Sequence, residues 1–488
     1  MQILNSISDW IWSNVIGYVL LGVGIFISIR LFFPQKYIIK AFGIMKNNIF
    51  QSKEGISGFG TMMAALGGQL GTGSLVGVSS ALFAGGPGAI FWMWATALFG
   101  MVITFSETIL GQLFRSKDKN GNFEGGPSYY IEKGLKLKSI AILMSVLYVF
   151  GIGLAIASIQ TNSIASAFTG VIKINPIIPG IIVVILAFLI MIGGMHRLSL
   201  VSIYLVPTMS ILYLLIVFYI IITQITQIPH IFTDIFVSAF TFKSALGGAI
   251  GWSITEAFRN GVARGMFSND AGNGTAAIMH ASANSRHPVE QGFLGMLGTF
   301  ITTIIICTAT ALAILATGSL NSNENGISLL QTAFGYSLGD VGRWVIFFAM
   351  FLFGFTTLLA DIRYGESNLK YIFKVNNTIP IYIYRVILAI ILILSSVVQL
   401  NLIWATVDLI LGFIVFINVI TLLFLFKYIR YLYNDYFGQV KEGTKNPIWN
   451  YKTDITKVNL KVKPDSRNIT RMNKTNENKS EINSNELQ

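Results

Sequence analysis

The feature that most constrains this chain is a glycine-rich segment, residues 67–77, inside an apolar stretch long enough to cross a bilayer. Five of its residues are glycine, and each glycine weakens a helix by about 0.8–1.0 kcal/mol relative to alanine. In hydrocarbon, backbone groups released from a helix are tolerated only where protein buries them or a cavity reaches them. Gln69, Thr72 and Ser74 lie beside this expected break. A membrane helix interrupted in this way predicts one half of a solute site, because broken helices expose backbone groups that bind solutes and ions.

The composition of the rest of the chain indicates an integral membrane protein. Of 488 residues, 53% are hydrophobic and 11% are charged, whereas soluble domains are about 25% charged. Since about 20 apolar residues cross a bilayer, we expect an all-α membrane protein with about eleven transmembrane helices. Their approximate ranges are 10–33, 58–83, 87–114, 140–169, 177–195, 198–224, 244–280, 290–317, 341–372, 379–399 and 401–428.

The distribution of lysine and arginine predicts how these helices are oriented. Every second connection is basic, as in residues 34–53 and 115–138, whereas residues 318–340 contain no lysine or arginine. Basic loops stay on the cytoplasmic side, so the N-terminus should be outside and the C-terminus inside a cell membrane. The first apolar run is too long for the h-region of a signal peptide and is expected to be a true span.

The chain is expected to divide into a transmembrane transporter domain, residues 1–433, and a polar, disordered cytoplasmic tail, residues 434–488. The tail is rich in Asn, Lys, Glu, Ser and Thr, and such a segment cannot bury enough apolar surface to fold alone. The net charge of +12 is carried by this tail and the basic loops, which indicates contact with anionic lipid and not with nucleic acid.

Several classes of function are disfavoured by the motif content. The single cysteine, Cys307, allows neither a disulfide framework nor a cysteine metal site. We find no catalytic constellation and no nucleotide-binding motif, so neither an enzyme nor a primary pump is expected. The energy for transport should come from an ion gradient, with no cofactor other than the coupling ion.

A second polar interruption lies in the seventh apolar run, at residues 259–275. It follows the first break by five spans, which is the spacing of two inverted repeats formed by spans 2–6 and 7–11, with span 1 added. Glycine-rich packing surfaces are the alternative explanation, because small residues let helices approach closely. Two breaks at corresponding positions, each with clustered amides and hydroxyls, favour a shared binding site.

These segments carry a resemblance to a known family. The motifs are GTG at 71–73, GGPGAIFWMW at 85–94, GGPSYYI at 125–131, ARGMFSNDAG at 263–272 and HPVEQG at 287–292. In this order the chain resembles the alanine or glycine:cation symporters, also called sodium:alanine symporters, over about residues 55–366. The resemblance implies a LeuT-type 5+5 inverted repeat with one extra N-terminal helix. It also implies Na⁺-coupled import of small neutral amino acids by alternating access.

The resemblance further implies which residues bind the amino acid. The first break contributes backbone amides and a hydroxyl, which would hold the carboxylate or amine because glycine lets a ligand approach the backbone. In span 4, Gln160 offers the donors and acceptors that a zwitterion requires, although an interhelical hydrogen bond is the alternative role. The implied substrate residues are Gly71, Thr72, Gly73, Ser74, Gln160, Phe267, Ser268 and Asn269. Asp361 is added to the candidate substrate residues as a departure from the family pattern.

A Na⁺ site is implied at Thr356 and Thr357 in span 9, with Gln69 as a further ligand. Hydroxyl and carbonyl oxygens from spans 2 and 9 suit a hard cation. The alternative is that these threonines bond carbonyls of their own helix, as threonines in membrane helices often do.

Three residues depart from the family pattern: Ser74 replaces a common Asn, Asp270 replaces a common Glu, and Asp361 replaces a common Trp. Asp361 follows Thr357 by four residues and shares its helix face. An intramembrane carboxylate is a functional hypothesis by default, so Asp361 either takes part in cation coupling or admits a larger or more polar amino acid. The alternative is a carboxylate near the cytoplasmic end, solvated or paired with Arg363 or Arg259.

Two other functions stay open at the level of sequence. One is an H⁺-coupled or broader-range amino-acid permease, which titration of Asp361 would favour. The other is a non-transporting amino-acid sensor that signals through the polar tail. The sequence indicates neither the exact amino acid and its chirality nor an oligomeric state.

Overall fold

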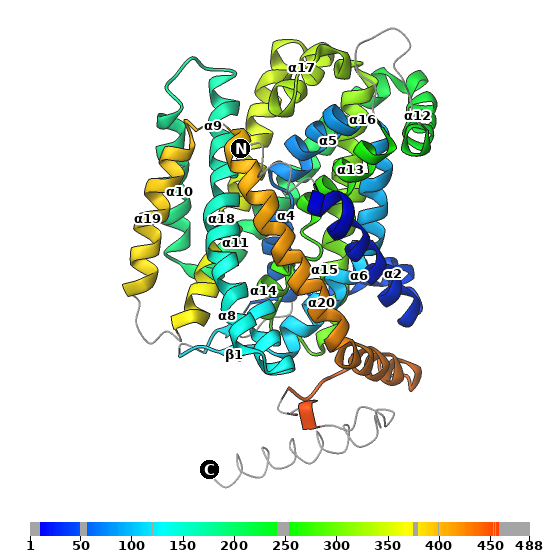
Figure 1. Ribbon diagram of the computed structural model, residues 1–488, viewed down its shortest axis with the longest axis vertical. Helices are drawn as coiled ribbons and strands as arrows, with labels where there is room; N and C mark the ends of the chain where they lie inside the picture. Colours follow the sequence, from blue (N-terminus) through cyan, green and yellow to red (C-terminus); the bar gives the residue numbers. More distant parts are fainter. Residues whose placement is uncertain are drawn as a thin grey trace.

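A computed structural model describes residues 10–48, 56–119, 121–241, 253–373, 379–398 and 400–451, together with 453 and 455–457 (Figure 1). Within these residues the fold is helical except for one antiparallel hairpin, β1 (Ser116–Lys117) with β2 (Phe123–Glu124). The first span is a π-helical turn (Trp12–Ile16) and α2 (Gly17–Arg30), followed after a bend of 69° by α3 (Ile38–Asn48).

The helices of the two expected repeats follow in chain order. The first contains α4 (Gly58–Gln69), η3 (Gly73–Gly77), α5 (Val78–Gly85), α6 (Gly88–Leu113), α7 (Pro127–Tyr130), η4 (Ile131–Leu135), α8 (Lys138–Leu147), η5 (Tyr148–Ile156), α9 (Ala157–Thr169), α10 (Ile177–Met191) and α11 (Gly194–Thr223). The second contains α13 (Ile254–Asn269), α14 (Thr275–Ala281), α15 (Pro288–Thr299), η7 (Phe300–Cys307), α16 (Thr308–Ala316), α18 (Asp340–Phe373), α19 (Ile379–Ser395) and α20 (Leu400–Lys441).

The described helices are compatible with eleven membrane crossings. Six are long and apolar enough to span a bilayer by themselves, or seven if the bent pair of α2 and α3 is one span. Two further predicted spans correspond to the shorter apolar helices α10 and α19. The remaining two are divided by breaks, between α4 and α5 and between α13 and α14. The start of the seventh predicted range, residues 244–252, lies outside the described residues.

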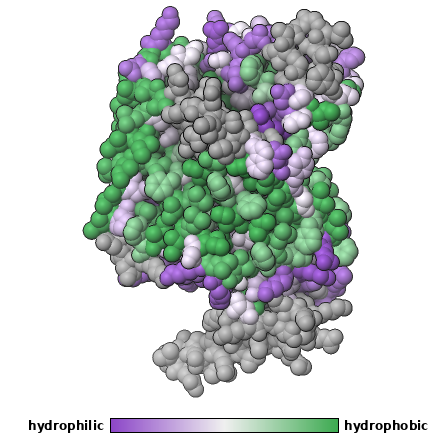
Figure 2. All heavy atoms as spheres, in the orientation of Figure 1, coloured by the Kyte–Doolittle hydropathy of each residue, from purple (hydrophilic) through white to green (hydrophobic). Residues whose placement is uncertain are grey.

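An apolar belt surrounds the molecule. Figure 2 shows hydrophobic side chains covering the middle of the visible face, with hydrophilic residues gathered toward its two ends. Large apolar side chains point outward along this belt, for example Leu215 at 60% and Phe424 at 67% exposure. Soluble monomers rarely expose apolar patches of this extent, so the belt marks the lipid-facing surface of a multi-pass membrane protein.

Two groups of helices face one another across α4. One is organised around α6, which packs against α2, α13, α14 and α15, and the other around α18, which packs against α9, α11 and η5. The helix α4 contacts members of both groups. Close approach depends on small residues: a Cβ on Gly261 in α13 would lie 2.4 Å from the Ala89 carbonyl oxygen in α6.

Several short helices join the predicted spans. They are η2 (Pro34–Tyr37), η6 (Ile225–Gln227), α12 (Ile228–Phe240), η8 (Ser319–Ser322) and α17 (Gly326–Leu338), and a further short helix, η9 (Ile455–Lys457), follows the last span. We did not predict them because each is too short to give a spanning signal. Of these, α17 packs against α18 and η3, close to the first break.

The folded body extends past the predicted start of the tail at residue 434. Helix α20 continues to Lys441, and Asp435 and Trp449 are buried. Trp449 N donates to the Arg286 carbonyl oxygen at 2.9 Å, and Phe437 stacks near Tyr37 with 4.9 Å between ring centroids. The aromatic residues of this stretch pack against the folded body, although the average composition of residues 434–488 is polar and led us to predict disorder. The later part of the predicted tail, residues 458–488, lies outside the described residues.

Candidate functional site

The two helix breaks meet at the centre of the molecule. Helix α4 ends at Gln69 and η3 resumes at Gly73, while α13 ends at Asn269 and α14 begins at Thr275. A Cβ on Gly73 would lie 2.8 Å from the Phe267 carbonyl oxygen, which is backbone and cannot move aside cheaply. Glycine at this position therefore lets the backbone of one break touch the backbone of the other.

A chain of hydroxyl contacts ties the breaks together behind this point. The Ser74 and Ser268 hydroxyls lie 3.2 Å apart, and Ser268 Oγ lies 2.8 Å from Cys307 Sγ. Thr310 Oγ1 donates to the Ser74 carbonyl oxygen at 3.1 Å. Each of these side chains is buried, so the contacts fix the register of α13 against η3.

The second break is held in a sharp turn by its own polar side chains. Asp270 takes a left-handed conformation with φ of 59°, and its carboxylate oxygens accept from Asn273 Nδ2 and Thr275 Oγ1, both at 3.0 Å. Asn269 Oδ1 accepts from the Ala271 amide at 3.0 Å. Asn269 therefore satisfies a backbone amide that the interruption leaves free, and Asp270 ties the end of α13 to the start of α14.

A membrane-embedded carboxylate supports the same break from the side of α6. Glu107 is fully buried, and its Oε1 accepts from Asn418 Nδ2 of α20 at 2.6 Å. Asn418 Nδ2 also donates to the Gly272 carbonyl oxygen at 2.8 Å, and Asn418 Oδ1 accepts from the Tyr130 hydroxyl. This network connects three helices to the backbone of the break.

A small cavity lies where the breaks face α9 and α18. Its volume of about 10 Å³ is close to the space that one water molecule needs, so the centre is contracted in this conformation. The cavity is lined by Gly68, Gln69, Gly71, Gly73, Ile152, Ile156, Gln160, Phe267, Asp270, Asn273, Thr275, Thr357 and Asp361. No lysine, arginine or histidine is among these described lining residues.

The predicted substrate residues divide between the cavity wall and the layer behind it. Gly71, Gly73, Gln160, Phe267 and Asp361 line the cavity. The remaining predicted residues support that wall and do not line it: Thr72, Ser74, Ser268 and Asn269.

Sequence reasoning missed several lining residues. Asn273 and Thr275 follow the second break, where a count of polar residues after Asp270 would have found them. Ile152 and Ile156 precede Gln160 by eight and four residues in the same span, so helical spacing places all three on one face.

Gln160 connects the first break to Asp361. Its Oε1 accepts from the Thr72 backbone amide at 3.2 Å, and its side chain lies beside the Asp361 carboxyl in the wall of the same cavity. The interhelical hydrogen bond that we considered as an alternative role is therefore present, in a side chain that also lines the cavity.

Asp361 is buried and has no salt-bridge partner among the described residues. It is 3% exposed, and its Oδ2 has no hydrogen-bond partner in the described part of the chain. The alternative in which it is solvated or paired with Arg363 is wrong, because Arg363 binds Glu124. An intramembrane carboxylate with an open coordination position is available to a ligand that donates hydrogen bonds.

The expected Na⁺ ligands come together only in part. Thr357 Oγ1 donates to the Gly67 carbonyl oxygen at 2.7 Å across the two helix groups, whereas Thr356 Oγ1 donates to Phe353 O at 3.0 Å within its own helix. A Cβ on Gly67 would lie 3.3 Å from Thr356 Cβ, so Thr356 packs against Gly67 while only Thr357 bonds its carbonyl oxygen. Gln69 Oε1 lies against Gly298, since a Cβ there would come within 2.8 Å of it.

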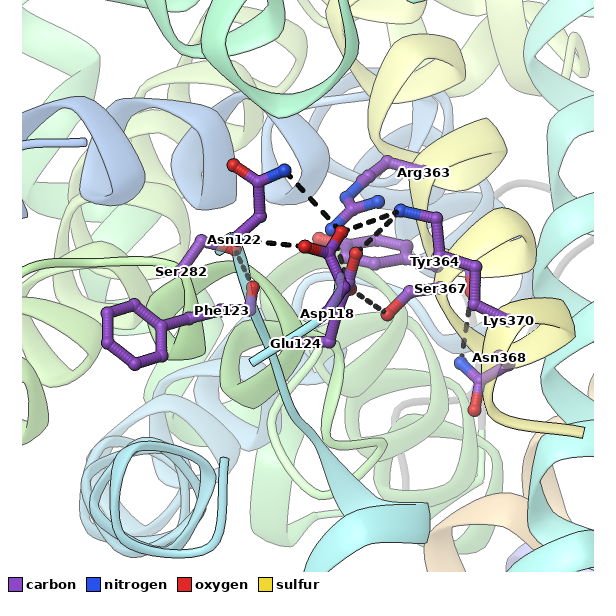
Figure 3. Close-up of polar contacts among 10 residues, drawn as sticks. All are labelled: Asp118, Asn122, Phe123, Glu124, Ser282, Arg363, Tyr364, Ser367, Asn368 and Lys370. Carbon is purple, nitrogen blue, oxygen red and sulfur yellow. Dashed lines mark hydrogen bonds and ion pairs between the residues drawn. The ribbon is translucent and has the colours of Figure 1, made fainter. Parts of the chain in front are cut away.

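A second polar cluster lies where the hairpin meets the end of α18 (Figure 3). Glu124 accepts from Arg363 Nη2 at 2.7 Å, from Lys370 Nζ at 2.8 Å and from Ser367 Oγ at 2.9 Å. Burial by itself raises the pKa of Glu124, but the charges of Arg363 and Lys370 outweigh it and lower the pKa to about 2. The carboxylate is therefore ionised and fully paired at neutral pH.

The same cluster forms part of the wall of a larger cavity of about 690 Å³. This cavity is lined by the hairpin, the connection between α10 and α11, and residues of α18 and α19. Its volume lies in the range of ligand pockets, and it gives the molecule a polar vestibule on one face.

Comparisons with known proteins agree with this architecture. Residues 1–450 match the sodium:alanine symporter family. The amino-acid carrier protein AlsT of Bacillus subtilis is 36% identical over 452 residues, which are 92% of this chain and 95% of that protein. The sodium/alanine symporter AgcS of Methanococcus maripaludis is 34% identical, over 87% of this chain and 94% of its own.

The fold is shared with a solved transporter of distant sequence. The crystal structure of MhsT in complex with L-phenylalanine superposes with a TM-score of 0.51 at 16% identity, over 79% of this chain and 90% of that chain. MhsT has the LeuT fold, so this chain, with its broken helices α4/α5 and α13/α14, shares that fold. On the family match and the relatives that span almost its whole length, the chain belongs to the sodium:alanine symporter family.

Proposed function

We propose that this protein is a secondary active symporter that imports small neutral amino acids, such as alanine or glycine, together with Na⁺. The observation that carries the proposal is the direct contact of two helix breaks, Gly73 against Phe267, beside a cavity lined by residues of both breaks. Exposed backbone groups at such breaks can recognise the carboxylate and amine that all amino acids share.

The proposed substrate site comprises the lining residues and the layer that orients them. Gly71 and Gly73 leave backbone amides accessible, and Thr72 contributes the amide that Gln160 now occupies. Phe267 closes the cavity from the second break. Ser74 and Ser268 hold the two breaks in register, and Asn269 shapes the second break. Substitution of these residues should therefore alter substrate binding through position and not through contact.

Na⁺ is proposed to bind where the Gly67 carbonyl oxygen meets Thr356 and Thr357. The hydroxyl of Thr357 donates to that carbonyl in this conformation, and a cation would turn the oxygens of both groups toward itself. Gln69 is a further proposed oxygen ligand, because its buried Oε1 lacks a hydrogen-bond partner among the described residues.

Alternating access requires that the vestibule of about 690 Å³ opens to one side of the membrane. The basic connections predict that this face is cytoplasmic, with the N-terminus outside. The proposed location is the cell membrane, with the lipid bilayer as the partner of the apolar belt.

The test is uptake of labelled alanine into proteoliposomes of the purified full-length protein. We expect accumulation when an inward Na⁺ gradient is imposed, and none in equimolar Na⁺ on both sides. Uptake driven by a proton gradient and indifferent to Na⁺ would support H⁺ coupling instead, a second candidate favoured by the buried Asp361 carboxyl in the cavity wall. Alanine binding without uptake under either gradient would contradict both and favour a sensor.

A further inference from the structure

Gln160 occupies a position between two groups of opposite polarity. On one side its carbonyl oxygen, Oε1, accepts from the Thr72 backbone amide at 3.2 Å. On the other side its carboxamide faces the Asp361 carboxyl, which lines the same cavity. Since Oε1 is taken by the amide, the Nε2 donors are the atoms left to face the carboxylate.

This arrangement matches the main-chain groups of a free amino acid. A zwitterionic α-amino acid carries an acceptor, its carboxylate, one carbon away from a donor, its ammonium. The carboxamide of Gln160 likewise carries an acceptor, Oε1, and a donor, Nε2, on the same carbon atom. A bound amino acid could therefore accept from Thr72 N and donate to Asp361, replacing both contacts that Gln160 now makes.

The surroundings of Asp361 favour an ammonium group over a neutral donor. Its Oδ2 has no hydrogen-bond partner among the described residues, and no cationic side chain is present in the described cavity lining. A buried carboxylate without a counter-charge is costly, and a cation with good hydrogen bonds offsets that cost. The α-ammonium is the cation that every amino acid brings to the site.

The neighbouring acidic residue does not offer the same opportunity. Asp270 lines the cavity too, but each of its carboxylate oxygens accepts from a side chain of its own turn, Asn273 or Thr275. Its hydrogen bonds hold the second break in shape. Asp361 has the open position.

We propose that Asp361 binds the α-ammonium of the substrate while the Thr72 amide binds its carboxylate, and that Gln160 bridges these two groups when the site is contracted. The inference rests on the proposed function in that the substrate is an amino acid. It assigns Asp361 to the part of the ligand that all substrates share, and not to their side chains. Substrate entry then requires the Gln160 carboxamide to move out of the bridge.

The test compares ligands that differ only at the ammonium position, by competition against labelled alanine binding to the purified full-length protein. In the unsubstituted protein, alanine should compete and L-lactate, with a hydroxyl in place of the ammonium, should compete far more weakly. In Asp361→Asn the inhibition constant for alanine should rise by roughly 30-fold or more, while that for lactate stays nearly constant. Glycine, alanine and serine should lose affinity by similar factors, and Asp361→Glu should recover part of the loss.

Ser163→Ala serves as the matched control. Ser163 is buried in the same helix as Gln160, does not line the cavity, and its hydroxyl has no hydrogen-bond partner in the described part of the chain. This variant should keep the discrimination between alanine and lactate. Thermal unfolding in detergent checks that each variant is folded.

Three results would overturn the inference. One is an unchanged alanine-to-lactate discrimination in a folded Asp361→Asn. Another is a loss confined to one amino-acid side chain, which would make Asp361 a side-chain selector. A third is a shift in Na⁺ dependence with unchanged discrimination, which would place Asp361 in cation coupling. Because this experiment measures binding, it can be distinguished from the transport test. A failure of Na⁺-driven uptake would refute the proposed function without changing the result for Asp361.

Discussion

Two buried carboxylates, Glu124 beside α18 and Asp361 within it, show how differently the same chemical group can be used. Glu124 packs against the C-terminal part of the helix and accepts from Arg363, Lys370 and Ser367 at 2.7–2.9 Å. Asp361 lies in the helix itself, has a free Oδ2 among the described residues, and forms part of the wall of the central cavity. The first carboxylate is satisfied by the protein, whereas the second has capacity left for a ligand.

The difference separates polar groups that stabilise the fold from polar groups that are available to a ligand. A carboxylate that is fully paired gains nothing from a ligand, so Glu124 should determine how the hairpin is held to α18. A carboxylate that keeps an open position is costly in the absence of a partner, and such groups concentrate where ligands bind. Substitutions in the two regions should therefore change different properties, stability in one and transport in the other.

The largest expected effect is on stability, from Glu124→Gln. The substitution leaves Arg363 without the carboxylate that it binds and Lys370 with only Asp118 among the described residues, at 3.9 Å, and breaking a buried ion pair in this way costs about 3–5 kcal/mol. We expect a marked fall in the unfolding temperature of the purified protein, measured by the fluorescence of unfolding in detergent. Asp118→Asn is the control, because Asp118 lies 3.9 Å from Lys370 and is partly exposed, where an ion pair contributes about 0–1 kcal/mol.

The pH dependence of stability provides a second measurement on the same pair. Because the pKa of Glu124 is lowered from 4.5 to about 2, its contribution is complete above pH 4.5 and is lost as the pH falls toward 2. Glu124→Gln should remove this part of the acid dependence. Equal acid profiles for the two proteins would show that the cluster does not stabilise the fold.

The next effect concerns transport, from Gly73→Ala in the first break. The new Cβ would lie 2.8 Å from the Phe267 carbonyl oxygen and 2.9 Å from Ser268 Cα, so the breaks must separate. Overpacking of this kind costs about 1–3 kcal/mol, and alanine uptake should fall by up to roughly 100-fold. Gly77→Ala is the matched control, since its Cβ would meet its nearest neighbours at 3.9 Å. Similar uptake by the two variants would contradict the role of the contact between breaks.

The smallest effect that we predict is on the coupling ion, from Thr357→Val. Loss of the hydroxyl beside the Gly67 carbonyl should raise the Na⁺ concentration for half-maximal uptake by roughly tenfold, which corresponds to about 1.4 kcal/mol. Uptake at saturating Na⁺ should change much less. Thr302→Val is the control, because Thr302 Oγ1 is also buried but donates to Gly298 O within its own helix. An unaltered Na⁺ dependence in Thr357→Val would exclude this threonine as a ligand.

Much of the architecture was predictable because its causes are local. Apolar length indicated the spans, and the glycines at 67–77 and 259–275 indicated where two of them break. The connecting helices α12 and α17 were not predicted, because short helices leave no spanning signal. The structured stretch between residues 434 and 451 was also missed. Its average composition is polar, and contacts with distant residues, such as that of Trp449 with Arg286, cannot be read from an average.

The sequence by itself determined that this is a broken-helix membrane protein, because hydrophobic length and glycine content act along the chain. The symporter family was indicated separately, by the resemblance of its motifs. Only the tertiary structure decided which polar groups are satisfied, because a hydrogen bond depends on what another helix places opposite. Arg363 and Asp361 are two residues apart in sequence, and pairing between them was a reasonable expectation. On a helix, neighbours at that spacing face different directions, so Arg363 binds Glu124 and Asp361 faces the cavity between the breaks.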